Sequence, residues 1–482
     1  MAPSAVQSTT ANVAEDAAPK KVVTTAPAQD DAVQAALTAA ITRFEEANPI
    51  SKKQHEIAVG TLPGGNTRSL LHTPPFPLCM KSGKGAYVWD EDGHKYCASY
   101  DKPIKLRRRE RYVDFVGELT AGLYGHSHPV IREAVVSTLD NVGLSLGATT
   151  VQEQKHAELI CSRFGLERVR FANTGTEANL HALNAARAFT GRRRVLVFSG
   201  GYHGGVLSFA DGKAAANNVD RDDWVIGKYN DVESARSLIE GTAGLAAVLV
   251  EAMQGSGGCI PGTSEFLHAI QDSAHAAGVL FVLDEVMTSR VHPGGLQRKL
   301  GLRPDLTVLG KYLGGGFPFG AFGGRADVMA VYDPRRPGAL PHSGTFNNNT
   351  MTTHAGYAGL RHVFTVEACA AFNAKGDALR ARLQRVARGT KLSFTGLGAV
   401  FNSHIVDGGL RDVDIRSADD LQHERWDLKD LFWFEMMEEG YWITRRGMIA
   451  LILVTPDEEL DRFVGCVERF LQRHKGIMAV QA

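Results

Sequence analysis

The sequence predicts an α/β fold with a mostly parallel sheet in a large domain, followed by a smaller α/β domain. In the middle of the chain, short apolar runs rich in β-branched residues alternate with amphipathic helical segments. Strands buried on both faces have this composition, and the intervening helices supply the crossovers that parallel pairing requires. A length of 482 residues suits two domains better than one. The predicted strands are 169–172, 195–198, 247–250, 279–283 and 306–309.

The pattern divides the chain into four segments. Residues 1–32 have no aromatic residue and no apolar period, so we expect a disordered tail. A helical pattern starts at Val33, and residues 33–112 form an N-terminal segment of the small domain. Residues 113–355 form the large domain. Residues 356–482 change to helix, strands and a last helix, and complete the small domain.

The composition excludes several classes of protein. The 53 Lys and Arg residues balance 53 Asp and Glu residues, which argues against a nucleic-acid binder or an anionic-membrane binder. No apolar run approaches the about 18 residues that a membrane span needs. The six cysteines are scattered without a CxxC pair, so we expect neither a disulfide framework nor a metal site. The chain lacks a recognisable targeting signal, and a cytoplasmic enzyme is the expectation.

Polar and glycine-rich residues follow the first two predicted strands, where ligands bind in open α/β sheets. Thr174, Gly175 and Thr176 open a helix after the first strand. Free N–H groups and the positive end of the helix dipole make such a start a phosphate cup, although an ordinary N-cap has the same composition. Tyr202 and His203 follow the second strand between glycines, which would let an aromatic ring approach a ligand.

An acid and a lysine follow two later strands. Asp284 could hold a ring nitrogen protonated, or it could cap the next turn. Lys311 comes directly after an apolar strand, where a lysine could be desolvated and nucleophilic; most lysines are solvated surface charges. Together, a phosphate cup, an aromatic ring, an acid and a lysine are the groups needed to hold a phosphorylated pyridine aldehyde.

These motifs resemble those of a known family. The segments are Asn173–Ala178, Gly201–Gly204, Asp284–Val286, Gly310–Lys311 and His342–Phe346. They resemble the class III aminotransferases of pyridoxal 5′-phosphate (PLP) fold type I, and the chain looks closest to the glutamate-1-semialdehyde aminomutase and β-amino-acid (β-phenylalanine-type) aminotransferase branch. The resemblance implies PLP as cofactor, a homodimer, and a mostly parallel seven-stranded sheet with a small domain from the N- and C-terminal segments.

The resemblance also implies a role for each residue. Lys311 would form the Schiff base with the cofactor and then move a proton, and Asp284 would pair with the pyridine nitrogen. Tyr202 and Val286 would cover the two faces of the ring. The remaining cofactor-binding residues would be Thr174, Gly175, Thr176, His203 and, from across the dimer interface, Thr345.

Arginines near the two ends of the chain bear on the substrate. Arg68 and the pair Arg445–Arg446 resemble carboxylate-binding positions of the β-amino-acid enzymes, with Arg446 taken as the substrate residue. Two guanidinium forks would suit an amino acid and 2-oxoglutarate, although both could be surface arginines. Ile449 aligns with a glutamate of the aminomutases. This departure favours a transaminase, with β-amino acids as candidate donors and secondary metabolism as a candidate role, over a 2,1-aminomutase.

One segment departs from the family pattern. Residues 97–112 interrupt a predicted hairpin and contain six basic residues and Pro103, which suit a strand poorly. The segment is either a surface loop or a gene-model artefact such as an unspliced intron. If it is real, it precedes 118–122, an expected approach to the active site, and a PLP-binding protein without catalysis is then a further alternative.

Overall fold

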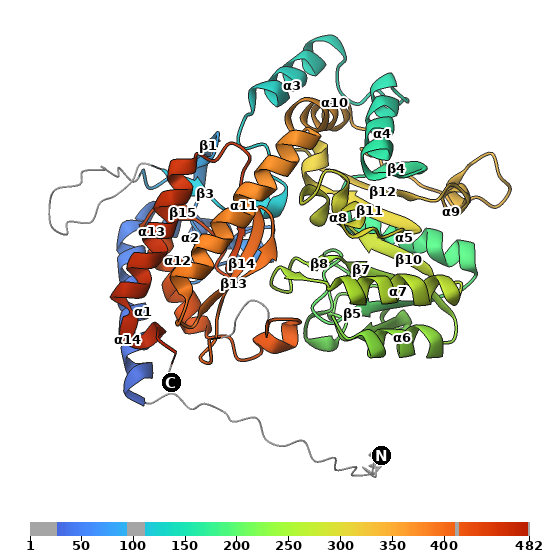
Figure 1. Ribbon diagram of the computed structural model, residues 1–482. Helices are drawn as coiled ribbons and strands as arrows, with labels where there is room; N and C mark the ends of the chain where they lie inside the picture. The colour runs from blue at the N-terminus through green and yellow to red at the C-terminus, as the bar shows by residue number, and fades with distance from the viewer. Residues whose placement is uncertain (1–26, 94–110, 410–413, 481–482) are drawn as a thin grey trace, which may run out of the picture.

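The computed structural model describes residues 27–93, 111–409 and 414–480 (Figure 1). Most of the tail expected at 1–32 and most of the segment 97–112 lie outside the described residues. Both expected boundaries need correction. Helix α1, Pro27–Ala47, begins before residue 33, with a proline in the first turn, where its missing N–H has no helical partner to lose. Tyr112 is not part of an insertion, because it is buried and begins strand β3.

The large domain is built on a seven-stranded sheet, as expected. β12 runs antiparallel to both of its neighbours, and the remaining pairs are parallel. All five predicted strands are present, and β6 and β12 were not predicted. In spatial order the strands are β4 (Arg168–Ala172), β12 (Gly320–Gly324), β11 (Leu306–Gly310), β10 (Leu280–Asp284), β7 (Leu245–Glu251), β5 (Arg194–Phe198) and β6 (Trp224–Gly227).

Both faces of this sheet are covered, which explains the continuous apolar runs. Leu196 and Phe198 point into one apolar cluster with α6 and α7, whereas Val195 and Val197 point into another with α5 and α9. The helices of the large domain and its connections are α3 (Pro129–Asn141), α4 (Val151–Phe164), α5 (Gly175–Thr190), α6 (Val232–Gly241), α7 (Ser264–Ala276), α8 (Gly295–Leu300), α9 (Ala326–Met329) and α10 (Thr350–Ala358). A short pair, β8 (Met253–Gln254) and β9 (Ile260–Pro261), lies beside the sheet.

The small domain joins the two ends of the chain. Its four-stranded sheet combines β1 (Met80–Lys84), β2 (Tyr87–Asp90) and β3 (Tyr112–Asp114) with the C-terminal β15 (Tyr441–Trp442). Its three-stranded sheet contains β13 (Leu392–Leu397), β14 (Val400–Ile405) and β16 (Met448–Ala450). The helices are α1, α2 (Pro49–Val59), α11 (Val366–Ala387), α12 (Trp426–Glu438), α13 (Asp457–Arg473) and α14 (Lys475–Met478).

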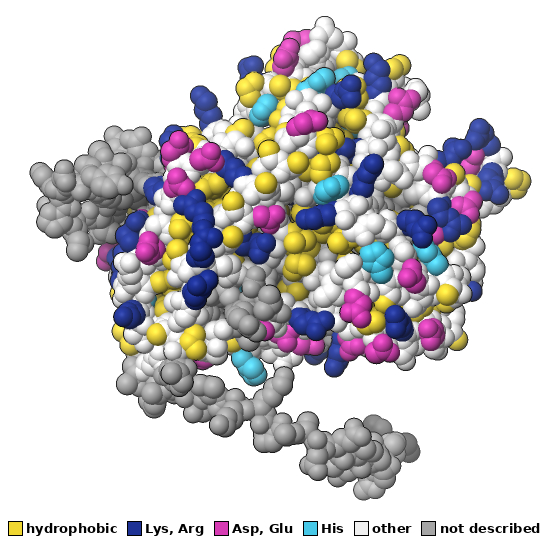
Figure 2. All heavy atoms as spheres, viewed as in Figure 1, with side chains coloured by type: hydrophobic (Ala, Val, Ile, Leu, Met, Phe, Trp, Pro, Cys, Tyr) yellow, Lys and Arg dark blue, Asp and Glu magenta, His cyan; other side chains and the backbone are white. Residues whose placement is uncertain are grey.

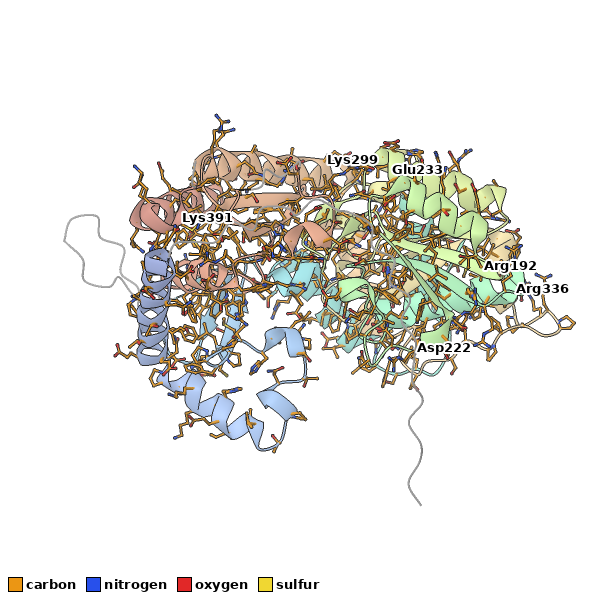
Figure 3. All side chains as sticks on the ribbon, turned by 90° about the horizontal axis from the view of Figure 1, so that it is seen from below. Arg192, Asp222, Glu233, Lys299, Arg336 and Lys391 are labelled. Atoms are coloured by element: carbon orange, nitrogen blue, oxygen red, sulfur yellow. The ribbon has the colours of Figure 1, made fainter. Side chains whose placement is uncertain are left out.

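Aromatic packing holds the N-terminal helix on the C-terminal segment. The ring of Phe44 on α1 lies 5.2 Å from that of Phe434 and 5.8 Å from that of Trp433, centroid to centroid, and both partners belong to α12. All three side chains are buried. In the view from below, α1 and α2 lie at the end of the molecule opposite to Arg192 and Arg336 (Figure 3). The expected construction of the small domain from both ends of the chain is therefore confirmed.

The surface matches the balanced composition. On the face shown in Figure 2, basic and acidic side chains are interspersed. Within the described ranges, no helix combines the length and the apolar character needed to cross a bilayer.

Gly320 tests the contact between β12 and the segment after β4. A Cβ atom at this position would lie 2.0 Å from the carbonyl oxygen of Thr174, so Gly320→Ala forces two backbones apart. We expect a loss of about 1–3 kcal/mol of stability, measured as the midpoint of urea unfolding. Gly241→Ala is the matched control, because nothing lies within 4 Å of its Cβ position. Equal midpoints for the two variants would contradict the tight contact.

Candidate active site

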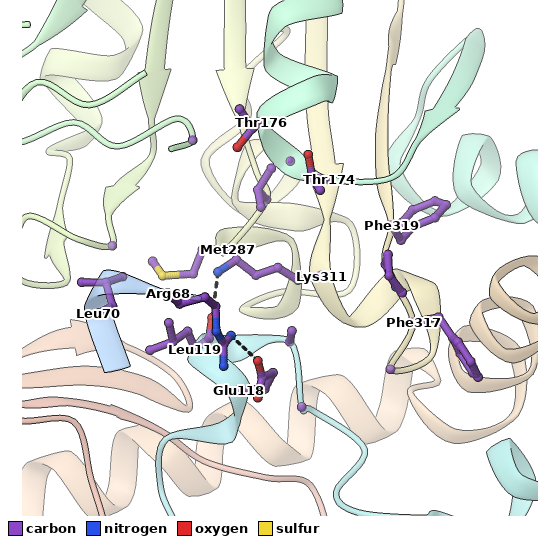
Figure 4. Close-up of a pocket in the computed structure, with 18 of the residues that line it drawn as sticks. Arg68, Leu70, Glu118, Leu119, Thr174, Thr176, Met287, Lys311, Phe317 and Phe319 are labelled. Atoms are coloured by element: carbon purple, nitrogen blue, oxygen red, sulfur yellow. Dashed lines mark hydrogen bonds and ion pairs between the residues drawn. The ribbon is translucent and has the colours of Figure 1, made fainter. Parts of the chain in front are cut away.

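A cavity of about 780 Å³ lies at the carboxyl edge of the large sheet. This volume is typical of a site for a small molecule. The large domain lines most of it, and the N-terminal and C-terminal segments close it with Arg68 and Arg446. Figure 4 shows Lys311 between the threonines at the start of α5 and the pair formed by Arg68 and Glu118. The predicted residues that line the cavity are Arg68, Thr174, Gly175, Thr176, Tyr202, His203, Asp284, Val286, Lys311 and Arg446.

Lys311 follows β11 directly and begins the short helix η7, Lys311–Gly314. Its φ of 58° lies in the left-handed region, which costs a lysine conformational energy and is common at functional sites. The amine donates a hydrogen bond of 2.7 Å to the carbonyl of Leu119. Burial, together with the nearby cation of Arg446, lowers the pKa of Lys311 to about 8. The structure thus places a partly neutral, nucleophilic amine in the cavity.

Asp284 ends β10, and its carboxylate is buried. Oδ2 accepts hydrogen bonds from Asn179 Nδ2 at 2.9 Å and pairs with His203 Nδ1 at 2.8 Å. Oδ1 accepts from the backbone N–H of Val286 at 2.9 Å, so the carboxylate also shapes the turn that follows. Three donors keep an acid acceptable in this buried position.

Glu251 lies beside Asp284, because the two residues face each other in the register of β7 and β10. Its carboxylate accepts the backbone N–H groups of Tyr202 at 3.0 Å and Gly255 at 2.8 Å. Burial, reinforced by the charge of Asp284, raises the pKa of Glu251. Glu251, the last residue of β7, therefore fastens the loop that carries Tyr202.

The segment Thr174–Thr176 begins α5. The Thr174 hydroxyl accepts the N–H of Glu177 at 3.1 Å, so this residue is an N-cap. The Thr176 hydroxyl accepts the N–H of Gly205 at 3.2 Å, and a Cβ at Gly204 would lie 2.3 Å from it. Capping and anion binding are compatible here, because the first N–H groups of a helix have no intrahelical acceptor.

The structure separates the two neighbouring C-terminal arginines. Arg446 lines the cavity and donates to Ser256 Oγ at 3.0 Å. Burial lowers its pKa. Arg445 instead forms an ion pair of 2.6 Å with Asp430 and is outside the set of cavity-lining residues. Ile449, the position compared with the aminomutase glutamate, is buried in the small-domain core, and its neighbour Met448 lines the cavity.

Thr345 is the one predicted site residue that the described chain does not bring to the cavity. It is exposed, and so is the neighbouring Phe346. The following Asn347 accepts a hydrogen bond of 3.0 Å from Asn173, next to the cup. A contribution from across a dimer interface requires an exposed Thr345, and this contribution stays a prediction.

Sequence reasoning assigned no role to several side chains of this site, among them Glu251, Asn179 and Glu118. Asn179 holds Asp284 from the buried side of α5, one helical turn after Gly175. A polar residue within the apolar stripe of a helix was the available signal. Glu118 pairs with Arg68, and no local pattern distinguishes it from an ordinary surface glutamate.

The residues present fit PLP. A helix start supplies N–H groups for a phosphate, a buried carboxylate is held ready at the end of β10, and an amine of lowered pKa lies between the start of α5 and Arg68. Glycine suits position 175 at the start of α5, because a Cβ there would lie only 3.0 Å from the side chain of Val286. This is the site of a PLP-dependent enzyme of fold type I.

Comparison with known proteins agrees with this class. The family model of the class-III aminotransferases matches residues 71–468, so the chain belongs to the class III aminotransferases, which are PLP-dependent transaminases. It is 48% identical over 451 residues to the β-phenylalanine transaminase of Variovorax paradoxus, covering 93% of this chain and 98% of that protein. It is 47% identical over 439 residues to an uncharacterized aminotransferase of Schizosaccharomyces pombe, covering 91% and 95%.

The structural comparison gives the same result. The crystal structure of the β-phenylalanine aminotransferase from Variovorax paradoxus superposes with a TM-score of 0.87 at 47% identity. The match covers 93% of this chain and 100% of that structure. The expected family, fold class and cofactor are therefore confirmed.

The lowered pKa of Lys311 predicts how the protein without cofactor captures PLP. Only the neutral amine attacks an aldehyde, so the rate of capture should rise with pH through a midpoint near pH 8. The absorbance of added PLP measures this rate. Arg446→Gln removes a cation that lowers this pKa, so the midpoint should move upward. Arg445→Gln, with its charge paired outside the cavity, should leave the midpoint unchanged. Capture that persists in Lys311→Ala would refute the assignment.

Proposed function

We propose that this protein transfers the amino group of a β-amino acid of the β-phenylalanine type to a keto acid such as 2-oxoglutarate. The observation that carries the proposal is the pair of arginines, Arg68 and Arg446, that reach one cavity from opposite ends of the sequence. The similarity to a β-phenylalanine transaminase over nearly the whole chain supports the donor class. In the reaction the amino group of the donor becomes an oxo group, and the oxo group of the acceptor becomes an amino group.

Bound PLP supplies an electron sink and carries the amino group between the two substrates. Residues of the large domain would hold it. The start of α5 would bind its phosphate, Asp284 would keep its ring nitrogen protonated, and Tyr202 and Val286 would cover its two faces. Asn179 and His203 hold the Asp284 carboxylate in place, so the acid keeps its position through the reaction.

Lys311 performs the proton transfers. Its amine lies in the cavity with a lowered pKa. It can therefore take a proton from the carbon that bears the amino group of the donor, and it can later give a proton to the carbon of the acceptor that receives the amino group. The carbonyl of Leu119 offers a hydrogen-bond acceptor to the amine, which orients it when it is free.

The arginines select the substrates. Arg68 is half-exposed at the cavity and grips the carboxylate of the donor, and the more buried Arg446 grips that of the acceptor. A guanidinium binds a carboxylate through two parallel hydrogen bonds, which fixes orientation as well as position. A donor and an acceptor of different length are thereby accepted in turn.

The arginine roles predict a selective loss of affinity. Arg68→Ala should raise KM for β-phenylalanine, and Arg446→Ala should raise KM for 2-oxoglutarate, each by about tenfold or more, since a hydrogen bond to a charged group contributes about 1.5–3 kcal/mol. Steady-state kinetics with each substrate varied measures both. Arg445→Ala is the matched control and should change neither KM. A wild-type protein that transfers no amino group from any β-amino acid would refute the proposed donor class.

We also propose a homodimer in which Thr345 completes the phosphate site of the partner. Its support is the exposed position of Thr345, together with the exposed Leu144, Leu146 and Phe346 on neighbouring loops. An exposed apolar surface of this kind is typical of a face that another chain covers.

Mixing two inactive variants tests the shared site. Lys311→Ala lacks the lysine, and Thr345→Asp places a negative charge where the phosphate is expected. In a mixed dimer, one site combines an intact Lys311 with an intact Thr345 from the partner, so transaminase activity should reappear after joint refolding. If Thr345 serves its own chain, no site is intact and the mixture stays inactive.

A further inference from the structure

The short helix η3, Gly117–Thr120, makes two contacts in the cavity. The carbonyl of Leu119 accepts the hydrogen bond of the Lys311 amine, and the carboxylate of Glu118 accepts one from the guanidinium of Arg68 (Figure 4). We propose that Glu118 sets the affinity of the site for carboxylates: it is a built-in carboxylate that occupies Arg68 until the carboxylate of a substrate displaces it. The inference rests on the proposed function of Arg68.

The backbone places Glu118 in this position at a conformational cost. Gly117, Glu118, Leu119 and Thr120 have φ values of 51°, 48°, 52° and 79°, a left-handed turn that side chains rarely adopt. Such strain persists only where the surroundings enforce it, and it clusters at ligand-binding sites. Glu118 is therefore held at the cavity by its backbone, unlike an ordinary surface glutamate.

Contacts on both sides enforce the turn. The carboxylate of Asp114 accepts the N–H groups of Val116 and Gly117, each at 2.9 Å. On the other side, Arg290 donates to the carbonyl of Thr120 at 2.9 Å and to that of Leu451 at 2.6 Å. The turn is thus tied to both domains, and a substitution of the Glu118 side chain leaves these backbone contacts intact.

The pair is suited to displacement. The side chains of Arg68 and Glu118 are 48% and 57% exposed, and a single guanidinium N–H joins them. An ion pair of this exposure contributes little stability, whereas a substrate carboxylate that takes two N–H groups binds more firmly. A carboxylate that arrives while Glu118 stays would meet a like charge, so occupation of Arg68 and departure of Glu118 go together.

The consequence is that Glu118 weakens the binding of carboxylate substrates to Arg68. Removing the Glu118 charge removes a competitor and tightens carboxylate binding, provided that Arg68 is present. The hydrogen bonds described above for Lys311 and Asp284 do not include the Glu118 side chain. The effect is therefore on affinity, and it disappears when Arg68 is replaced.

The test measures binding of 3-phenylpropanoate, a carboxylate that cannot donate an amino group, to the cofactor-loaded protein by calorimetry. Glu118→Gln should lower its dissociation constant by about two- to fivefold, the range for an exposed ion pair. In an Arg68→Gln background the same substitution should have no effect. Glu45→Gln is the matched control, because Glu45 forms an exposed pair with Lys52 and is not among the cavity-lining residues.

The outcomes separate the two proposals. If Arg68→Gln leaves the binding of 3-phenylpropanoate unchanged, the proposed carboxylate role of Arg68 is wrong. If Arg68→Gln weakens binding but Glu118→Gln does not tighten it, only the displacement by substrate is wrong. A gain in affinity that persists without Arg68 overturns it as well, because a general charge effect then accounts for the change.

Discussion

The buried carboxylate of Asp284 is the interaction on which the rest of the site depends. A charge in this position is tolerable only because Asn179, His203 and the N–H of Val286 converge on it. These donors come from α5, from the loop after β5 and from the turn after β10. The hydrogen bonds to Asp284 therefore bring together the start of α5, the loop of Tyr202 and the end of the central strand β10. In the proposed function, these segments bind the ring and the phosphate of the cofactor.

In the proposed function, the large domain provides the reacting groups, and the terminal segments provide the arginines that bind the substrates. Lys311, Asp284 and the start of α5 all belong to the seven-stranded sheet and its connections, whereas Arg68 and Arg446 come from the terminal segments. Arg290 links the two parts, because its buried guanidinium donates to Thr120 and to Leu451.

Burial shifts two ionisable groups of the cavity toward their neutral forms. Burial lowers the pKa of Lys311 and raises that of Glu251, and the neighbouring charges of Arg446 and Asp284 act in the same directions. Burial makes each charge costly, and a neighbouring charge of the same sign adds to that cost. The result is a lysine, Lys311, with a lowered pKa in the same cavity as Asp284, whose carboxylate keeps its hydrogen bonds.

The sequence by itself determined the five apolar strands and the fold class, because continuous apolar runs can be recognised from neighbouring residues alone. It also indicated most of the residues at the strand ends, because ligands bind at that edge of a parallel sheet. It did not reveal β12, a glycine-rich strand defined by close backbone approach, as at Gly320 against Thr174. Only the tertiary structure showed that Arg445 pairs with Asp430 outside the cavity that Arg446 lines, and it alone joined Asn179 to Asp284 and Glu118 to Arg68. Those contacts link residues far apart in the chain, and packing decides them.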